Sequence, residues 1–174
     1  MQLTDSIGFA SVRSQVKNGS MTVIPIIRPA VASDLCGMLL LLSHLNPADP
    51  KPEPDAAAEV WRRMLAADGM TVFLAELPGV DHPVATCTLL VAPNLTRGAR
   101  PQALIENVVT HADYRRQGLG RAILDAAVNA AWQAGCYRVT LTTGSKREET
   151  LRFYERAGFK RNTKTAFEMR RAGF

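Results

Sequence analysis

The most constraining feature of the sequence is a seven-residue segment, Arg115–Arg121 (RRQGLGR), that joins a strand pattern to an amphipathic helix pattern. The backbone N–H groups at the start of a helix have no acceptor within the helix, and the helix dipole places partial positive charge at the same end. Gly118 and Gly120 carry no Cβ atom, so an anion could approach the main chain there, and the arginines add positive charge. A strand followed by such a turn and helix predicts an α/β fold with a phosphate-type anion site at the helix start.

Two other phosphate-binding loops do not fit this segment. A Walker loop needs the pattern GxxxxGK[ST], and the sequence contains no Gly-Lys-Ser or Gly-Lys-Thr. A dinucleotide-binding fingerprint needs a third glycine where Ile123 stands. Two glycines alone are also compatible with a turn that simply begins a helix, so the interpretation needs support from the rest of the chain.

The remaining sequence alternates strand and helix patterns. Apolar and β-branched runs predict strands, whereas apolar residues at helical spacing predict helices. The predicted strands are 22–27, 70–76, 84–92, 103–110, 137–143, 159–161 and 165–169; the predicted helices are 35–45, 56–67, the stretch from the glycine-containing segment to about 134, and 148–157. This order predicts an α/β (α+β) fold in which about four helices flank a mixed central sheet of about six or seven strands.

Length and composition indicate one domain. With 174 residues, 47% of them hydrophobic, the chain can bury one sizeable core. Residues 1–20 have weak apolar periodicity and are interpreted as a mobile leader, which leaves 21–174 as a single domain. The apolar run 35–45 is too short to span a membrane, and the first residues lack the pattern of a secretory signal. We therefore expect a cytoplasmic protein without a membrane partner.

The side chains that most often bind metals are not arranged as a metal site. His44, His82 and His111 are far apart in the sequence and are expected to be separate surface or turn residues. The three cysteines show no CxxC or Cys/His spacing and are expected to be buried as small apolar side chains. The sequence therefore predicts no metal.

The charge balance of the chain is compatible with several anionic partners. The formal net charge is +5, which could attract nucleic acid, a membrane surface or an anionic cofactor. Only 6% of the residues are aromatic, and no run interleaves aromatic with basic residues for base stacking. We expect no nucleic-acid partner, and a basic nucleic-acid-binding module is the rival hypothesis.

Two motifs occur at a compatible spacing. The first is [RQ]xxGxG before a helix and after a strand that ends in VVTHADY, and the second is LRFYERAGF at 151–159. Together they resemble the GNAT superfamily of N-acetyltransferases, and the order of elements matches from about Thr22 to Arg170. The resemblance implies a three-layer fold and an enzyme that transfers an acetyl group from acetyl-CoA to a primary amine by direct attack in a ternary complex.

The resemblance also implies roles for individual residues. The amides of Arg116 to Arg121 would hold the pyrophosphate of acetyl-CoA, and the main chain of residues 108–110 would pair with the pantetheine arm as an added strand. Tyr154 matches the tyrosine that in many members acts as general acid toward the leaving thiolate; the alternative is a packed aromatic side chain. The cofactor-binding residues expected on this basis are Val108, Val109, Thr110, Arg115, Arg116, Gln117, Gly118, Leu119, Gly120 and Arg121.

Glu106 is the candidate general base. An alkyl amine with a pKa of about 10.4 in water must lose a proton before it attacks a thioester. Glu106 is the only carboxylate in the predicted strand 103–110, where alternation would place it on one face with Leu104 and Val108. The alternative is an edge residue that faces solvent or pairs with an arginine. Some superfamily members carry an acid on the following strand, but the matching position here is Thr142, which cannot act as a base.

The acceptor is expected to be the amine of a small molecule. The segments 104–109 and 142–154 resemble amino-sugar phosphate and aminoalkylphosphonate acetyltransferases. Asn94, Arg97 and Arg100 could contact an anionic group of such a substrate, or form a solvated face or a dimer contact. A protein or peptide N-acetyltransferase, a catalytically silent acetyl-CoA-binding regulatory domain and assembly as a homodimer all stay open.

One position departs from the family pattern. Many members have an asparagine seven residues before the tyrosine, whereas this chain has Arg147. An arginine could meet a phosphate, but its geometry differs, so no role is carried over to it.

Overall fold

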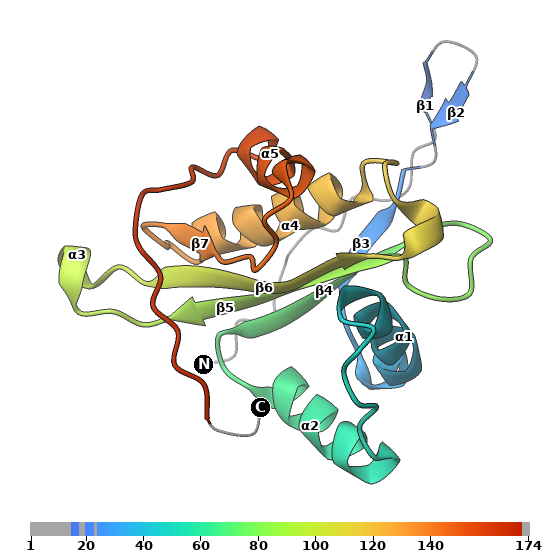
Figure 1. Ribbon diagram of the computed structural model, residues 1–174, viewed down its shortest axis with the longest axis horizontal. Helices are drawn as coiled ribbons and strands as arrows, with labels where there is room; N and C mark the ends of the chain where they lie inside the picture. Colours follow the sequence, from blue (N-terminus) through green and yellow to red (C-terminus); the bar gives the residue numbers. More distant parts are fainter. Residues whose placement is uncertain (1–14, 18–19, 23, 172–174) are drawn as a thin grey trace.

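The protein folds as three layers, with helices on both faces of one central sheet (Figure 1). The computed structural model describes residues 15–17, 20–22 and 24–171. Helices α4 and α5 cover one face of the sheet, and α1 and α2 cover the other. The predicted α/β fold with helices flanking a mixed sheet is confirmed.

From β3 to α5 the elements follow the predicted order, with the short α3 in addition. The central strands are β3 (Ile26–Pro29), β4 (Met70–Glu76), β5 (Ala85–Ala92), β6 (Gln102–Thr110) and β7 (Val139–Leu141). The helices are α1 (Leu35–Leu45), α2 (Pro54–Ala66), the short α3 (Thr96–Ala99), α4 (Leu119–Gln133) and α5 (Glu148–Arg156), with 3-10 turns at Ala32–Asp34 and Ala112–Tyr114. No helix within the described ranges is both long and apolar enough to cross a membrane.

The structure describes only part of the segment that was predicted to be a leader. β1 (Gln15–Lys17) pairs antiparallel with β2 (Ser20–Thr22) in a separate two-stranded sheet. Residues 1–14, 18–19 and 23 lie outside the described residues. The division into a leader (1–20) and a single domain (21–174) therefore stays a prediction.

The central sheet has the order β3-β4-β5-β6-β7. The first four strands are antiparallel neighbours, and β7 runs parallel to β6. A parallel neighbour requires a crossover connection, and α4 supplies it between β6 and β7. The start of α4 therefore lies just beyond the end of β6.

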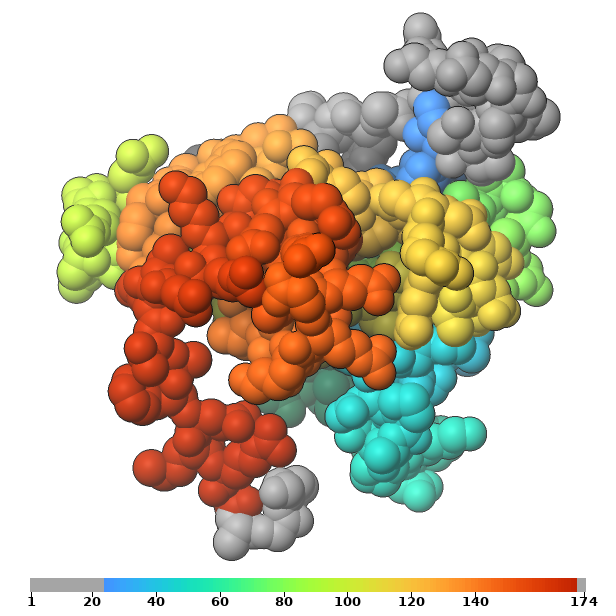
Figure 2. Space-filling model, turned by 45° about the horizontal axis from the view of Figure 1, so that its top comes forward, coloured from blue at the N-terminus to red at the C-terminus, as the bar shows by residue number. Residues whose placement is uncertain are grey.

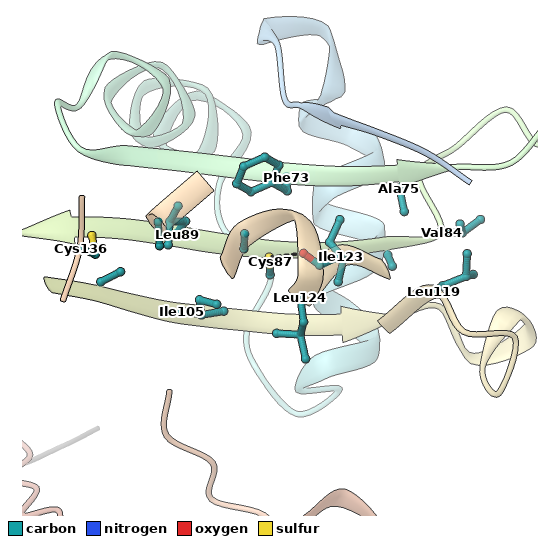
Figure 3. Close-up of a cluster of buried hydrophobic side chains, with 14 residues drawn as sticks. Phe73, Ala75, Val84, Cys87, Leu89, Ile105, Leu119, Ile123, Leu124 and Cys136 are labelled. Carbon is teal, nitrogen blue, oxygen red and sulfur yellow. Dashed lines mark hydrogen bonds between the residues drawn. The ribbon is translucent and has the colours of Figure 1, made fainter. Parts of the chain in front are cut away.

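An apolar cluster on each face holds the helices to the sheet. On the α4 face, the fully buried Ile123 and Leu124 pack against side chains of β4, β5 and β6, including Cys87 and Ile105 (Figure 3). On the other face, the cluster is formed by Met38, Leu41, Trp61, Val72, Leu74 and Val109. Burial on both faces fixes the position of β6 and of the α4 start relative to each other.

The cysteines confirm the prediction of buried apolar side chains in two of three cases. Cys87 and Cys136 are buried, whereas Cys36 is exposed. Cys36 lies on α1, whose residues Met38 and Leu41 face the sheet. The expectation for Cys36 is wrong because it lies on the opposite side of that amphipathic helix.

The sheet has five strands instead of the predicted six or seven. Residues 159–161 and 165–169 form no strand, and the side chains of Phe167 and Met169 are 94% and 98% exposed. A period-two pattern favours a strand, but it does not determine whether the segment reaches the edge of a sheet. Within one chain, the segment 165–169 pairs with no strand of the described residues.

Candidate active site

A bulge interrupts β6 shortly before its end. The pairing of β5 with β6 shifts register between Thr86 and Thr88, so Asn107 and Val108 lie opposite a single residue of β5. Asn107 adopts a left-handed φ of 53°, a conformation that asparagine tolerates better than most side chains. The bulge therefore has a local cause in the sequence, although a strand pattern does not reveal it.

The bulge changes which face the side chains of β6 occupy. Ile105 and Val108 both pack in the cluster under α4, whereas Val109 packs in the cluster on the other face. Glu106 follows Ile105 in regular alternation and so faces away from Val108. The prediction that Glu106 and Val108 share a face is wrong, because the bulge inserts one residue between them.

The end of β6 also has an open edge. The parallel ladder joins Ala103–Ile105 only to Val139–Leu141. On that side, residues 106–110 of β6 have no strand partner among the described residues. An edge of this kind can pair with an extended ligand that carries amides.

The start of α4 offers free amide donors next to this edge. Gly118 is the N-cap residue, and the first helical hydrogen bond runs from the Ala122 N–H to the Gly118 carbonyl over 3.0 Å. The N–H groups of Leu119, Gly120 and Arg121 have no acceptor within the described residues. Three donors thus lie at the positive end of the helix dipole, as an anion site requires.

The two glycines of the loop serve different purposes. Gly118 has a left-handed φ of 82°, and a Cβ atom built there would meet no atom within 4 Å. A Cβ atom on Gly120 would lie 3.1 Å from Cζ of Phe153. Gly118 is therefore needed for the backbone conformation, whereas Gly120 lets α4 pack closely against α5. The expectation that the missing Cβ of Gly120 opens the main chain to a ligand is wrong, since that direction is filled by α5.

A hollow of about 530 Å³ joins the open edge of β6 to the start of α4. Every predicted cofactor-binding residue lines it except Gln117, whose side chain donates instead to the carbonyl of Asp113. The predicted residues brought together here are Val108, Val109, Thr110, Arg115, Arg116, Gly118, Leu119, Gly120 and Arg121. Tyr154 lines the same hollow, and so does Arg147, to which sequence reasoning gave no role.

The arginines of the hollow differ in how they are held. Arg115 donates from Nε to the carbonyl of Thr110 over 3.2 Å, and Arg121 forms an ion pair with Asp125 at 2.8 Å. The guanidinium groups of Arg116 and Arg147 have no such partner within the described part of the chain. Arg115 therefore braces the loop against the end of β6 and Arg121 is held along α4, while Arg116 and Arg147 are available to an anionic ligand.

Tyr154 lies on α5 with its ring packed against Phe153 and Phe159, at centroid distances of 5.0 and 6.4 Å. Burial raises the pKa of Tyr154, and the nearby Glu106 carboxylate raises it further. The hydroxyl group therefore keeps its proton at neutral pH, which a proton donor must do.

Glu106 is half-buried on β6, immediately before the bulge. It does not line the hollow itself. The alternative that Glu106 pairs with an arginine is not observed, because Glu106 forms no ion pair within the described residues. Its role as a base therefore stays a prediction.

Three residues of the loop before β6 lie away from the hollow. Arg97 lies in α3, and Asn94 and Arg100 flank that helix, at the opposite end of β6 from the α4 start (Figure 1). A strand of this length spans roughly 25–30 Å at about 3.3 Å per residue. These side chains therefore do not reach the hollow of their own chain.

The fold brings together three histidines that were expected to lie apart. The rings of His44 and His111 have centroids 4.1 Å apart, and those of His82 and His111 are 5.3 Å apart. The three rings form no group that could hold a metal ion. The expectation of separate residues is wrong because α1, the β4–β5 loop and the end of β6 converge here, and no sequence signal marks that convergence.

His111 connects this cluster to the phosphate-type loop. Its Nδ1 accepts the N–H of Asp113 over 3.3 Å and so caps the turn Ala112–Tyr114. The turn leads directly into Arg115 and the start of α4. A ring that accepts at Nδ1 is neutral, with its single proton on Nε2.

Comparison with known proteins identifies relatives in sequence and in structure. A sequence profile of the Acetyltransferase (GNAT) family matches residues 38–159. A glucosamine 6-phosphate N-acetyltransferase of Trypanosoma brucei brucei is 34% identical over 134 residues, which cover 77% of this chain and 88% of that protein. The solved structure of a putative acetyltransferase from Agrobacterium tumefaciens is 46% identical, with a TM-score of 0.79 over 83% of this chain and 99% of that one.

A more distant structure shows the fold alone. The aminoglycoside N-acetyltransferase AAC(6')-Iy, solved in complex with CoA, has a TM-score of 0.70 at 19% identity. The match covers 86% of this chain and 96% of that one.

Acidification is expected to destabilise the fold through His111. The pKa of His111 lies below its usual 6.5, mainly because burial disfavours the charged imidazolium. The neighbouring His44, His82 and Arg115 lower this pKa further, while Asp113 raises it. A histidine with a lowered folded pKa contributes stability above its unfolded pKa, and this stability is lost as the pH falls through the folded value.

The measurement compares urea unfolding of the wild type and His111→Gln at about pH 7 and about pH 5. Glutamine can still accept the Asp113 N–H but does not titrate. The wild type should lose more stability than the variant between the two pH values. Equal losses would show that His111 does not carry the effect.

Proposed function

This chain belongs to the Acetyltransferase (GNAT) family, and from that premise we propose that its acceptor is the primary amine of an amino sugar phosphate. The chain is an N-acetyltransferase that transfers an acetyl group from acetyl-CoA to a small-molecule amine. The finer assignment is supported by the name of the relative at 34% identity, which acts on glucosamine 6-phosphate.

The hollow next to α4 is suited to acetyl-CoA by two independent features. The free amides of Leu119 to Arg121 are donors for the pyrophosphate, with Arg116 and Arg147 as added positive charge. The unpaired edge of β6 beyond Ile105 can accept the amides of the pantetheine arm. We propose that these elements bind the co-substrate and present its thioester beside Tyr154.

Glu106 is the proposed general base and Tyr154 the proposed general acid. Glu106 accepts a proton from the acceptor amine, directly or through water, and the neutral nitrogen attacks the thioester carbon. A main-chain N–H near Val108 or Val109 donates to the carbonyl oxygen as negative charge develops there. The new C–N bond forms, the C–S bond breaks, and Tyr154 gives its proton to the leaving sulfur.

The chemistry of Cys87 favours this direct route over an acetyl-enzyme. Cys87 is fully buried, and burial raises the pKa of its thiol to about 12. Only a thiolate is an effective nucleophile, so Cys87 stays inert at neutral pH.

A homodimer, a cytoplasmic location and the absence of nucleic-acid and membrane partners stay predictions of the same hypothesis.

Replacing the proposed acid and base should separate chemistry from binding. Glu106→Gln and Tyr154→Phe should each lower kcat by about 10²–10⁴-fold with glucosamine 6-phosphate as acceptor, because each removes one proton transfer. Tyr137→Phe is the matched control, since among the described residues the Tyr137 hydroxyl donates to Gln102 on β6 and to no other side chain. Thiol release from acetyl-CoA measures the rates, and wild-type rates in the first two variants would contradict these roles.

The same assay distinguishes the alternative functions. Activity toward peptide N-termini without activity toward amino sugars or aminoalkylphosphonates would identify a peptide N-acetyltransferase. Tight CoA binding without thiol release for any amine would identify a silent binding domain.

A pair of glycine variants tests the phosphate loop. Gly118 and Gly135 both have a left-handed φ, 82° and 76°, and a Cβ atom on either would meet nothing within 4 Å. Alanine should therefore cost each position a similar amount of stability, about 1–2 kcal/mol. Only Gly118→Ala also disturbs the amides of Leu119 to Arg121.

Titration calorimetry with CoA gives the readout. We expect Gly118→Ala to raise the Kd by roughly tenfold or more, equal to about 1.4 kcal/mol, and Gly135→Ala to leave it unchanged. If the two variants bind CoA alike, the loop does not hold the diphosphate.

A further inference from the structure

Thr88 on β5 carries a buried hydroxyl group that contributes no hydrogen bond to the fold. Thr88 is 2% exposed, and its Oγ1 is buried without a hydrogen-bond partner among the described residues. β5 is the middle strand of the sheet; in Figure 2 α4 and α5 (orange to red) lie over the sheet, and the loops at the two ends of β5 (green and yellow-green) project on opposite sides. An unpaired hydroxyl in a packed core is destabilising, so a reason other than stability is expected for it.

Thr88 faces the side of the sheet that α1 and α2 cover. Its chain neighbours Cys87 and Leu89 both point into the cluster under α4 (Figure 3), so alternation turns Thr88 the other way. On β4 it is paired with Val72, which belongs to the apolar cluster on the α1 and α2 face. The cross-strand neighbour of Thr88 on this side is therefore apolar and offers the hydroxyl no partner.

The cross-strand neighbour on the other side is Glu106. Thr88 and Glu106 are paired directly in the antiparallel ladder of β5 and β6, at the last regular pair before the bulge. Side chains of such a pair share one face, with Cβ atoms about 4.5–5.5 Å apart. At that separation a hydroxyl can donate to a carboxylate directly or through one water molecule.

The other threonine hydroxyl on this face of β5 already has a partner. Thr86 is fully buried, and its Oγ1 donates to the carbonyl of Phe73 over 2.8 Å. Thr86 is paired with Val109, whereas Thr88 is paired with Glu106. Of the two threonines, the one beside the carboxylate is thus the one whose hydroxyl is unused.

We propose that Thr88 is a positioning residue for Glu106, whose carboxylate accepts a hydrogen bond from the Thr88 hydroxyl, directly or through one water molecule. The inference rests on the proposed function, because it requires Glu106 to act as the base. Thr88 keeps its own proton throughout, and the proton of the acceptor amine passes to Glu106. A donor at this place favours the charged carboxylate, which is the state in which a base is active, and fixes its orientation.

The variant Thr88→Val removes the hydroxyl with little change in shape. With glucosamine 6-phosphate as acceptor, kcat at neutral pH should fall by about tenfold, because a charged group loses a hydrogen-bond donor. The acid limb of the kcat profile should move to higher pH for the same reason. Thr88→Ser keeps the hydroxyl and should restore both, whereas a wild-type profile in Thr88→Val would overturn the proposal.

Urea unfolding separates a positioning role from a structural one. A buried hydroxyl without a partner does not stabilise the fold, so Thr88→Val should be at least as stable as the wild type although less active. Thr86→Val is the matched control, which should lose stability and keep the acid limb of the wild type. If Thr88→Val is the less stable variant and Thr88→Ser does not restore activity, Thr88 acts through packing and the proposal is wrong.

Carbon-13 titration of the Glu106 carboxyl group in the free protein gives a readout without turnover, with Glu106→Gln to assign the signal. The midpoint should move to higher pH in Thr88→Val, and it should stay in place in Thr88→Ser and Thr86→Val. An unmoved midpoint in Thr88→Val would refute this inference and leave Glu106 as the proposed base. Wild-type rates in Glu106→Gln would instead remove the proposed function on which the inference rests.

Discussion

The site depends on one constraint, which is that β6 loses its neighbour on one side before it ends. The ladder to β7 stops at Ile105, and the bulge at Asn107 and Val108 turns the next residues to new faces. An unpaired strand edge inside a three-layer fold is costly unless a ligand satisfies it. The extended, amide-bearing arm of acetyl-CoA is a ligand of the right chemistry.

The packing of α4 places the second half of the site. Ile123 and Leu124 are fully buried against the sheet, so the helix cannot shift without opening the core. Its first turn therefore lies at a fixed place beyond the end of β6, with the free amides of Leu119 to Arg121 beside the open edge. Gly120 adds to this by letting α5 approach, which brings Tyr154 to the same hollow.

Sequence reasoning succeeded where local chemistry determines the structure. The glycines and arginines of 115–121 predicted the loop, and β-branched runs predicted β4 and β5 to within a residue. It failed where the outcome depends on distant parts of the chain. The bulge at Asn107, the meeting of the histidines around His111 and the role of Arg147 as a lining residue depend on contacts between separate elements. The prediction of a strand at 165–169 failed for the same reason, because a strand pattern does not show whether a sheet edge is placed to receive the segment.

The most direct test of the account is a titration of the isotope-labelled chain with CoA, followed by amide chemical shifts in solution. The account predicts that the largest shifts fall on Gly118 to Arg121 and on residues 108–110, with smaller changes elsewhere. Unchanged amides in both segments at millimolar CoA would show that neither the helix start nor the open edge of β6 binds the co-substrate. The proposed chemistry of Glu106 and Tyr154 would then lose its basis.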